Sequence, residues 1–253
     1  MTSEDRTGCL RNMKKRQKPR LQLLCFAHAG ASAEAYRAWL NHLPDDVELW
    51  AVEPPGRAFR CTEAPWRTMQ GLVEEVGSSV AEVASRPFMM FGHSLGALQA
   101  FETVRWLRER KLPLPQQLCV SAFRGPHLSS RTAGMSALPD QEFVNELIVR
   151  YGGANHVLED PDLRAVALPA LRSDFELLES YAYQPAAPAP CPIMAFGGNA
   201  DAVVSPEELA GWAMHTQDSF ALSLRDGDHF YVEQHFMDMI KAMLSAERRQ
   251  YKN

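Results

Sequence analysis

A serine flanked by two glycines, placed between an apolar run and a helical pattern, constrains this chain most strongly. Phe88–Phe91 is typical of a buried strand, the segment GHSLG follows directly at 92–96, and apolar residues then recur at helical spacing from 97 to about 110. A serine lifted clear of a strand end needs a strained backbone, with no room for a Cβ atom beside it. Strand, sharp turn and helix together predict a nucleophile elbow with Ser94 as the nucleophile, the alternative being a glycine-rich turn in which Ser94 only caps the helix.

Short apolar runs and helical patterns alternate along most of the chain. Helical stripes are clearest at 66–84 and in the last helix after residue 231. Alternation of this kind predicts an α/β fold with a mainly parallel central sheet, flanked by helices, whose catalytic groups gather at the carboxyl ends of the strands. A length of 253 residues fits one such domain. The runs expected to form strands are Leu21–Phe26, Glu48–Glu53, Phe88–Phe91, Leu118–Phe123, Ile193–Phe196 and Phe220–Leu224.

About seventy residues between the fourth and fifth of these strands carry helical patterns and no strand signal. Helices are expected at 140–151 and at 160–181, the second interrupted at Pro169. An insertion of this size above the strand ends predicts a helical lid over about 127–185, which covers the elbow. Phe143 and Phe175 are among the apolar lid residues expected to contact the substrate.

The N-terminal residues and the composition indicate where the domain begins and which kinds of partner and compartment to expect. Residues 1–20 are basic and lack an apolar segment, so we expect a flexible N-terminal tail, no secretory signal, and a domain over 21–253.

A net charge of −5 argues against nucleic acid as a partner, and no apolar run approaches the roughly 20 residues that span a bilayer. The five cysteines are an odd number without a C-x-x-C pair, and Cys25 and Cys119 lie in apolar runs. These features predict free thiols and a soluble, cytoplasmic protein.

A serine hydroxyl needs a base to accept its proton. His229 lies directly after the last predicted strand and before the last helix, so it is expected at the same sheet edge as Ser94. The alternative is a polar residue that caps the final helix. We interpret His229 as the base.

A carboxylate must hold that base in one tautomer, and in α/β hydrolases the order along the chain is Ser, then Asp or Glu, then His. Asp201 follows the predicted strand at 193–196 through a short loop, which fits this order, although it could simply cap a turn. Asp226 and Asp228 are too close in sequence to His229 to orient its ring, and Asp174 belongs to the predicted lid. Asp201 is therefore the predicted third member.

The oxyanion of the tetrahedral intermediate needs two backbone donors. One comes from the residue after the nucleophile, Leu95, and the other from the loop after an early strand, where position favours Ala29. His28 either orders this loop through side-chain hydrogen bonds or is a core histidine with its own partners. Both interpretations of His28 stay open, and its place in this loop also makes it a candidate substrate-binding residue.

Motifs over nearly the whole chain after Leu21 resemble those of the type II (external) thioesterases that accompany nonribosomal peptide and polyketide synthases. LCFAHAGASA at 24–33 is similar to the family's L-x-C-F-P-H-A-G-G-S-A, and VEPPGR at 52–57 to its V-x-x-P-G-R. GHSLG at 92–96 matches G-H-S-[ML]-G, LPALRSDF at 168–175 resembles L-P-x-L-R-A-D-F, and DHFY at 228–231 corresponds to G-H-F-F. The chain departs from the pattern at Ala27, Ala31, Ala58 and Asp228, none of which removes a catalytic group.

The resemblance implies hydrolysis of acyl groups from the phosphopantetheine arm of acyl or peptidyl carrier proteins by Ser94, His229 and Asp201, without a metal or an organic cofactor. It also implies transient binding of the carrier by a monomer. Arg57 and Arg124 are placed near the strand ends, where either could pair with the arm's phosphate, although each could equally be a solvated or locally paired arginine. A thioesterase for acyl coenzyme A or a carboxylesterase would use the same residues. A non-catalytic scaffold that binds carriers is the alternative from another class.

Overall fold

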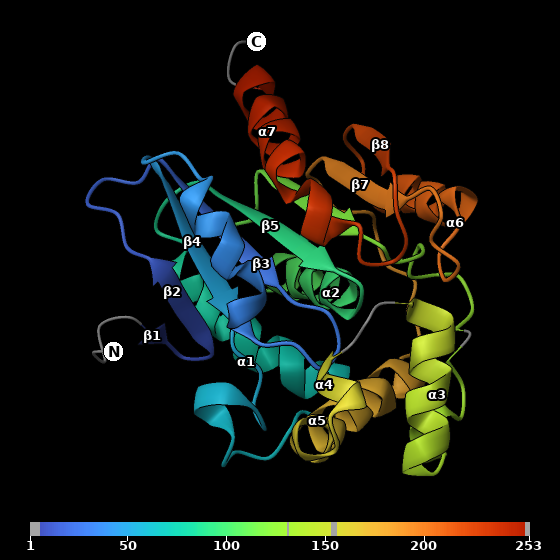
Figure 1. Cartoon of the computed structure of the whole chain (residues 1–253). Helices are drawn as coiled ribbons and strands as arrows, with labels where there is room; N and C mark the ends of the chain where they lie inside the picture. Colours follow the sequence, from blue (N-terminus) through green and yellow to red (C-terminus); the bar gives the residue numbers. More distant parts are fainter. Residues whose placement is uncertain (1–5, 131, 153–155, 251–253) are drawn as a thin grey trace.

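The computed structural model describes residues 6–130, 132–152 and 156–250. A sheet of eight strands crosses the molecule in the order β1-β2-β4-β3-β5-β6-β7-β8 (Figure 1). The strands from β3 to β8 are parallel, and β1 and β2 are antiparallel additions at one edge. All six predicted strands are present, with ends shifted by at most two residues. They are β3 (Leu21–Phe26), β4 (Val47–Val52), β5 (Phe88–His93), β6 (Gln117–Ser121), β7 (Ile193–Gly198) and β8 (Phe220–Arg225).

Helices cover both faces of the sheet. One face packs against α1 (Met69–Val83) and α2 (Leu95–Glu109), and the other against the 3-10 helix η2 (Ala33–Asn41) and α7 (Val232–Gln250). Because both faces are covered, β3 is buried at all six positions and its sequence is a continuous apolar run apart from one glutamine. The predicted α/β architecture is confirmed.

The N-terminal residues form part of the sheet. β1 (Arg6–Thr7) pairs with β2 (Leu10–Lys14), which pairs with the outer side of β4. The prediction of a flexible tail over residues 1–20 is therefore wrong from residue 6 onward, and residues 1–5 lie outside the described part. A short hairpin at the rim of a sheet needs few apolar residues, here the buried Leu10 of β2, and the basic residues find partners, as Arg11 does in Glu34.

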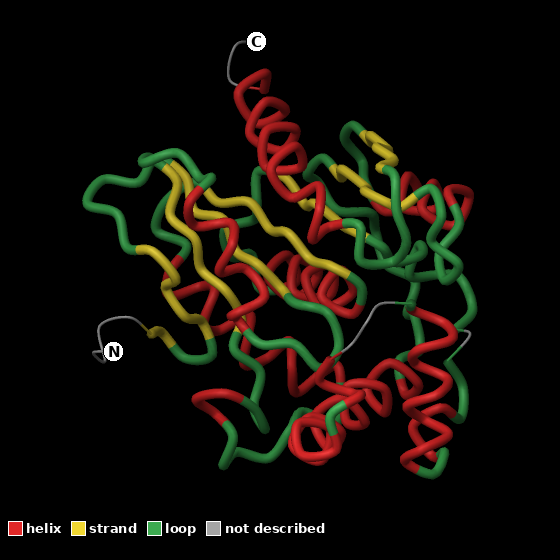
Figure 2. Tube along the Cα trace, viewed as in Figure 1, coloured by secondary structure: helices red, strands yellow, loops and turns green. Residues whose placement is uncertain are grey.

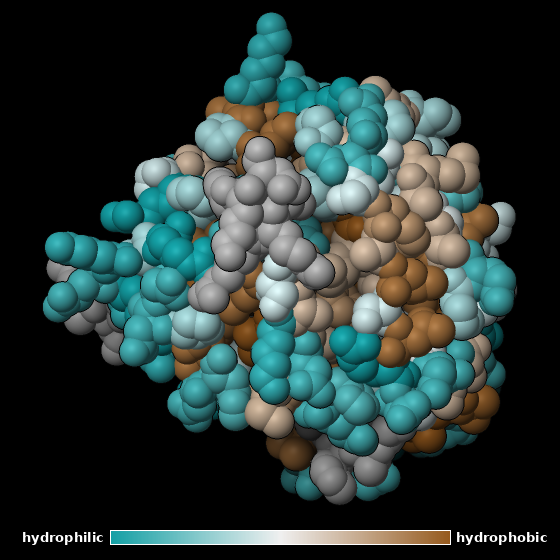
Figure 3. Space-filling model, turned by 90° about the horizontal axis from the view of Figure 1, so that it is seen from above, coloured by the Kyte–Doolittle hydropathy of each residue, from teal (hydrophilic) through white to brown (hydrophobic). Residues whose placement is uncertain are grey.

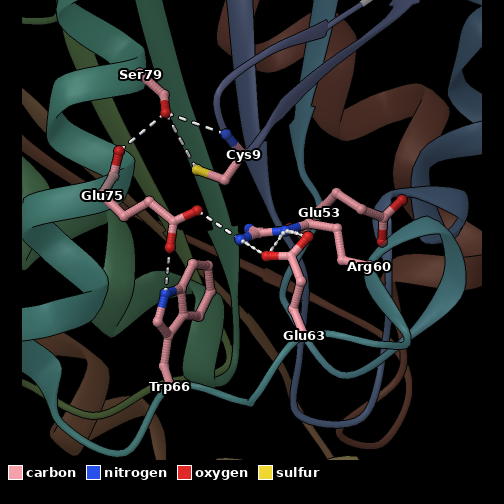
Figure 4. Close-up of polar contacts among 7 residues, drawn as sticks. All are labelled: Cys9, Glu53, Arg60, Glu63, Trp66, Glu75 and Ser79. Carbon is pink, nitrogen blue, oxygen red and sulfur yellow. Dashed lines mark hydrogen bonds and ion pairs between the residues drawn. The ribbon is translucent and has the colours of Figure 1, made fainter.

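Side-chain contacts attach this N-terminal hairpin, and the loop after β4, to α1 (Figure 4). The backbone N–H and the thiol of Cys9 both donate to Ser79 Oγ, at 3.2 and 3.5 Å, and Ser79 donates in turn to the Glu75 carbonyl. The Glu75 carboxylate accepts from Trp66 and pairs with Arg60 at 2.7 Å. Burial raises the pKa of the Cys9 thiol to about 12, so this cysteine is a neutral donor.

The segment between β6 and β7 is helical, as predicted. It contains the short 3-10 helix η4 (Met135–Ala137), α3 (Asp140–Tyr151), α4 (His156–Glu159) and α5 (Pro161–Ser180). These helices lie beyond the tips of the strand arrows (Figure 1), in a part of the molecule built from helices and loops (Figure 2). They share a small apolar core of their own, which includes Phe143, Leu147, Leu168 and Phe175.

The predicted interruption at Pro169 does not occur, because α5 continues through it. The proline removes one backbone donor, and Leu168 and Ala170 on either side of it are buried and hold the helix in place. Asp160 caps the start of α5 by accepting the N–H groups of Asp162 and Leu163.

β8 forms the other edge of the sheet and is only partly covered. α6 (Pro206–Ala210) and the 3-10 helix η5 (Gly211–His215) precede it, and the sequence patterns predicted neither. Leu222 and Leu224 of β8 are more than a third exposed, and Figure 3 shows apolar residues gathered on the side of the molecule where β7 and β8 lie. None of the described helices combines the length and the apolarity needed to cross a bilayer.

Candidate active site

Ser94 occupies the sharp turn between β5 and α2 with φ +55° and ψ −124°, outside the regions that L-residues prefer. A Cβ atom at Gly92 would lie 2.1 Å from the carbonyl oxygen of Gly96, and one at Gly96 would lie 2.0 Å from the carbonyl oxygen of Phe26. The two glycines are therefore required by close backbone approach. The Ser94 N–H donates to the Ser121 carbonyl at 2.7 Å, which helps to hold the strained turn.

The structure brings Ser94, His229 and Asp201 together from the loops after β5, β8 and β7. His229 Nε2 lies 3.0 Å from Ser94 Oγ, and His229 Nδ1 lies 2.9 Å from Asp201 Oδ2. The other oxygen of Asp201 accepts the N–H groups of Val203 and Val204. Because the carboxylate only accepts, Nδ1 carries the imidazole proton and Nε2 is left to accept the proton of the serine hydroxyl.

The three carboxylates that were not chosen as the partner of His229 bind other groups. Asp226 accepts from the side-chain amide of Asn199, and Asp228 accepts the N–H of Phe230 at the start of the next turn. Asp174 lies in α5 and pairs with Arg57. The geometry therefore agrees with the choice of Asp201 as the carboxylate beside His229.

The loop that follows β3 places Ala29 next to Ser94, on the wall of the same cavity. His28 Nδ1 donates to the Ala29 carbonyl at 3.0 Å, which favours the interpretation that His28 orders the loop. Burial lowers the pKa of His28, so its ring is neutral with the proton on Nδ1. Leu95 begins α2, and among the described residues no protein group accepts the N–H of Leu95 or of Ala29.

An apolar cavity of about 250 Å³ lies between this loop and the lid. Ser94 and His229 form its floor, and Phe175 lines it as predicted. Phe143 does not line it, because its ring lies fully buried behind that of Phe175, with the ring centroids 5.4 Å apart. The expected substrate contact of Phe143 is thus replaced by a role in the lid core. The other apolar wall residues are Leu147, Ile148, Leu158, Leu171 and Leu178.

A second cavity, of about 280 Å³, reaches the same serine and histidine along a different wall. Its lining includes two arginines, Arg124 and Arg150, together with Thr132, whereas the described lining of the first cavity includes no arginine or lysine. Tyr151 lines both cavities, and its ring centroid lies 5.0 Å from that of His229. Burial raises the pKa of Tyr151 to about 12, so the phenol is neutral. Sequence reasoning missed Tyr151, because nothing distinguishes it from any last residue of a helix.

The two arginines that were predicted to bind phosphate lie in different surroundings. Arg57 forms a two-pronged ion pair with Asp174, at 2.7 and 2.8 Å, and both side chains are only about one-tenth exposed. Arg57 is therefore locally paired, and the expectation that it meets a phosphate at the entrance is wrong. Arg124 lines the second cavity, with its Nε donating to the Leu128 carbonyl.

His93, inside the elbow motif, is a further residue of the site that sequence reasoning did not assign. Its Nδ1 lies 2.8 Å from Ser121 Oγ, which lies 2.6 Å from the Tyr231 hydroxyl. Burial, with His229 and His28 nearby, holds the pKa of His93 well below its usual range. A neutral His93 ring thus packs against His229, with the centroids 5.4 Å apart. Within the described residues no cluster of His, Cys, Asp or Glu could hold a metal ion.

The sequence model of the family described as "Thioesterase domain" matches residues 21–245, nearly the whole of the chain that carries this geometry. The chain belongs to the thioesterase family. Gramicidin S biosynthesis protein GrsT of Aneurinibacillus migulanus is 34% identical over 229 residues, which cover 90% of each chain. The expected membership of this family is thereby confirmed.

Solved thioesterase structures agree with the fold as well as with the sequence. The type II thioesterase BorB from the borrelidin biosynthetic cluster superposes with a TM-score of 0.87 at 32% identity, over 94% of this chain and 97% of that one. YbtT, the type II thioesterase of the Yersiniabactin NRPS/PKS pathway, gives 0.82 at 29% identity, with the same coverage. This thioesterase is thus a serine hydrolase of the α/β-hydrolase fold.

Proposed function

We propose that this thioesterase hydrolyses acyl groups bound as thioesters to the phosphopantetheine arm of a carrier protein, and so clears stalled or wrongly loaded chains from a nonribosomal peptide or polyketide synthase. The proposal rests on one observation: two cavities, one lined by apolar residues of the lid and one with two arginines in its lining, meet at Ser94 within reach of His229. The relatives that act in such pathways support it.

The chemistry follows from the hydrogen bonds at the site. Ser94 Oγ attacks the thioester carbonyl carbon while His229 Nε2 takes the hydroxyl proton, and Asp201 stabilises the imidazolium that forms. The N–H groups of Ala29 and Leu95 donate to the oxyanion. The tetrahedral intermediate collapses, the C–S bond breaks, and the thiolate leaves with the proton from His229. Water, activated by the same histidine, then attacks the acyl-serine ester and releases the acid.

The two cavities suit the two ends of such a substrate. In an acyl-pantetheine thioester the apolar acyl chain and the polar arm extend from the carbonyl in opposite directions, so a site for it needs two branches that meet at the nucleophile. We assign the acyl chain to the apolar cavity under the lid and the arm to the cavity lined by Arg124 and Arg150. A guanidinium there can pair with the phosphate of the arm.

The carrier domain is proposed to bind transiently, with the thioesterase acting as a cytoplasmic monomer. The cysteines support a reducing compartment, because the five are free and four of them are buried. Light scattering of the purified chain would measure the oligomeric state.

The test compares three substrates with the same acyl group: an acyl carrier protein, acyl coenzyme A and a simple ester. We expect the highest kcat/KM with the carrier. A preference for the simple ester would favour the carboxylesterase alternative, and equal rates with carrier and coenzyme A would favour a general acyl thioesterase.

Ser94→Ala is the control for the chemistry. It removes one hydroxyl from a turn that glycines and packing hold, so the variant should fold normally, lose hydrolysis of all three substrates and lose labelling by a serine-directed phosphonate. A soluble Ser94→Ala protein that keeps a substantial fraction of wild-type hydrolysis would show that the serine has been wrongly assigned. A wild-type protein that hydrolyses none of the three substrates would instead favour the scaffold alternative.

A further inference from the structure

The carboxylate of Asp174, on the lid helix α5, is bonded directly to the loop that carries Ala29. It accepts the N–H of Gly30 at 2.7 Å and two N–H groups of Arg57 at 2.7 and 2.8 Å. Gly30 also packs on the same helix, because a Cβ atom built there would lie 2.9 Å from a terminal carbon of Leu171. The loop after β3 therefore rests on α5 over about one turn of the helix, at Leu171 and Asp174.

These contacts fix the orientation of the Ala29 N–H. The peptide after Ala29 is held at both ends, since its carbonyl accepts from His28 Nδ1 and its N–H donates to Asp174. The peptide before Ala29 contains the His28 carbonyl, which accepts the N–H of Ala31 at 3.1 Å. With both flanking peptide planes held, the remaining donor, the Ala29 N–H, keeps one direction. An oxyanion donor must be held in this way before the charge develops.

Arg57 supplies the charge that lets a carboxylate occupy this buried place. Besides Asp174, its guanidinium donates to the carbonyl of Ala31 in the loop and lies 3.5 Å from that of Ala170 in α5. One arginine thus bonds to the loop and to the helix at once. A carboxylate about one-tenth exposed would be costly without such a partner.

We propose that Asp174, held by Arg57, is a positioning residue through which the docking of α5 completes the oxyanion hole. When α5 is docked, the Ala29 N–H points to the site of the developing charge; when α5 moves away, Gly30 loses its acceptor and the donor loses its direction. The lid helix therefore sets the reactivity of Ser94 as well as covering the acyl chain. The inference rests on the proposed roles of Ser94 and Ala29.

Asp174→Asn is the primary test, because it keeps the shape but presents an amide N–H₂ to one of the donors. Loss of a whole oxyanion donor costs about 10²–10³ in kcat, so misdirection of one should cost on the order of 30-fold. KM should change less than about threefold, since the ground-state carbonyl makes little use of the donor. The affinity for an acyl trifluoromethyl ketone, which forms a tetrahedral adduct with Ser94, should fall in parallel with kcat.

Asp140→Asn is the matched control. Asp140 pairs with Arg172, the α5 residue two positions before Asp174, at 2.7 Å, but this pair joins α5 to α3 within the lid and touches no part of the loop at 27–32. The control should keep kcat and inhibitor affinity within twofold of the wild type. An equal loss in both variants would show that general loosening of the lid, and not the bond to Gly30, is responsible.

The double variant Arg57→Met with Asp174→Leu separates positioning from stability. A buried ion pair replaced by two apolar side chains often restores or raises stability, so Tm should stay near the wild-type value while kcat remains low. Recovery of kcat together with Tm would overturn the inference, as would an Asp174→Asn variant with wild-type kcat and inhibitor affinity. If Ser94→Ala were still active, the proposed function would fail first; if Ser94→Ala is inactive and the Asp174 variants are normal, only this inference fails.

Discussion

Replacing Asp201 by Asn should nearly abolish turnover without unfolding the protein. Asp201 Oδ1 accepts two backbone N–H groups, from Val203 at 2.8 Å and Val204 at 3.3 Å, so the amide oxygen of Asn would keep that place. The N–H₂ group then replaces Oδ2 beside His229 Nδ1 and forces that nitrogen to accept. The imidazole proton moves to Nε2, the atom 3.0 Å from Ser94 Oγ, which can no longer take the serine proton.

The size of the loss follows from the chemistry of this tautomer. The equivalent change in serine proteases lowers kcat by about 10⁴, which corresponds to about 5.5 kcal/mol of activation free energy. Thiol release from an acyl-pantetheine thioester measures kcat, and thermal unfolding at the same pH measures stability. Tm should change little, because both backbone donors keep an acceptor.

Asp226→Asn is the matched control, since Asp226 lies three residues before His229 and binds Asn199. It should keep kcat within about twofold of the wild type, as surface substitutions usually do. A loss of less than tenfold in Asp201→Asn would refute the reasoning about the tautomer. A larger loss in Asp174→Asn than in Asp201→Asn would show that the wrong carboxylate has been assigned to the histidine.

Three further results are expected. Arg124→Ala should raise KM for an acyl carrier protein with little change in kcat, and should spare a short thioester without the phosphate; equal losses on both substrates would contradict a phosphate contact. Amides of α3 and α5 should exchange with solvent faster than those of β3–β7, and equal protection would count against a mobile lid. Burial and the neighbouring His127 lower the pKa of His215 from 6.5 to about 4. At pH 5 the unfolded chain therefore binds a proton at His215 that the folded protein does not bind. The contribution of neutral His215 to the free energy of unfolding is present above pH 6.5 and is lost as the pH falls toward 4. His215→Gln should reduce the proton uptake on unfolding at pH 5 by about one, and an unchanged slope of stability against pH would refute this.

The reacting groups could be predicted because the residues that follow the strands of a parallel sheet all lie at the same edge of that sheet. Ser94, Asp201 and His229 each follow a different strand, and the carboxyl ends of parallel strands meet at one edge. No distance had to be known to bring them together. The five strands from β3 to β7 were predictable for a related reason, since strands covered on both faces are apolar almost throughout, whereas β8 is apolar although it is only partly covered.

What the sequence did not predict depends on partners far away in the chain. Arg57 has the same appearance in sequence whether it meets a phosphate or a carboxylate, and the carboxylate that it meets, Asp174, is 117 residues away. Phe143 and Phe175 have the same apolar character, and only the packing of α3 on α5 decides which of them faces the cavity. The tail prediction failed similarly, because β2 gains its strand conformation by pairing with β4.

The N-terminal hairpin also matters for keeping molecules of this thioesterase apart. The backbone N–H and C=O groups on the outer side of β4 pair with β2. Just beyond the end of β4, the N–H of Glu53 donates to the Cys9 carbonyl at 2.8 Å. A chain shortened to begin at residue 21, where the match to the family starts, would leave this row of backbone groups open and uncover the apolar surface beneath Leu10. An open strand edge beside apolar surface is a template for another chain, so such a shortened protein would self-associate through β4.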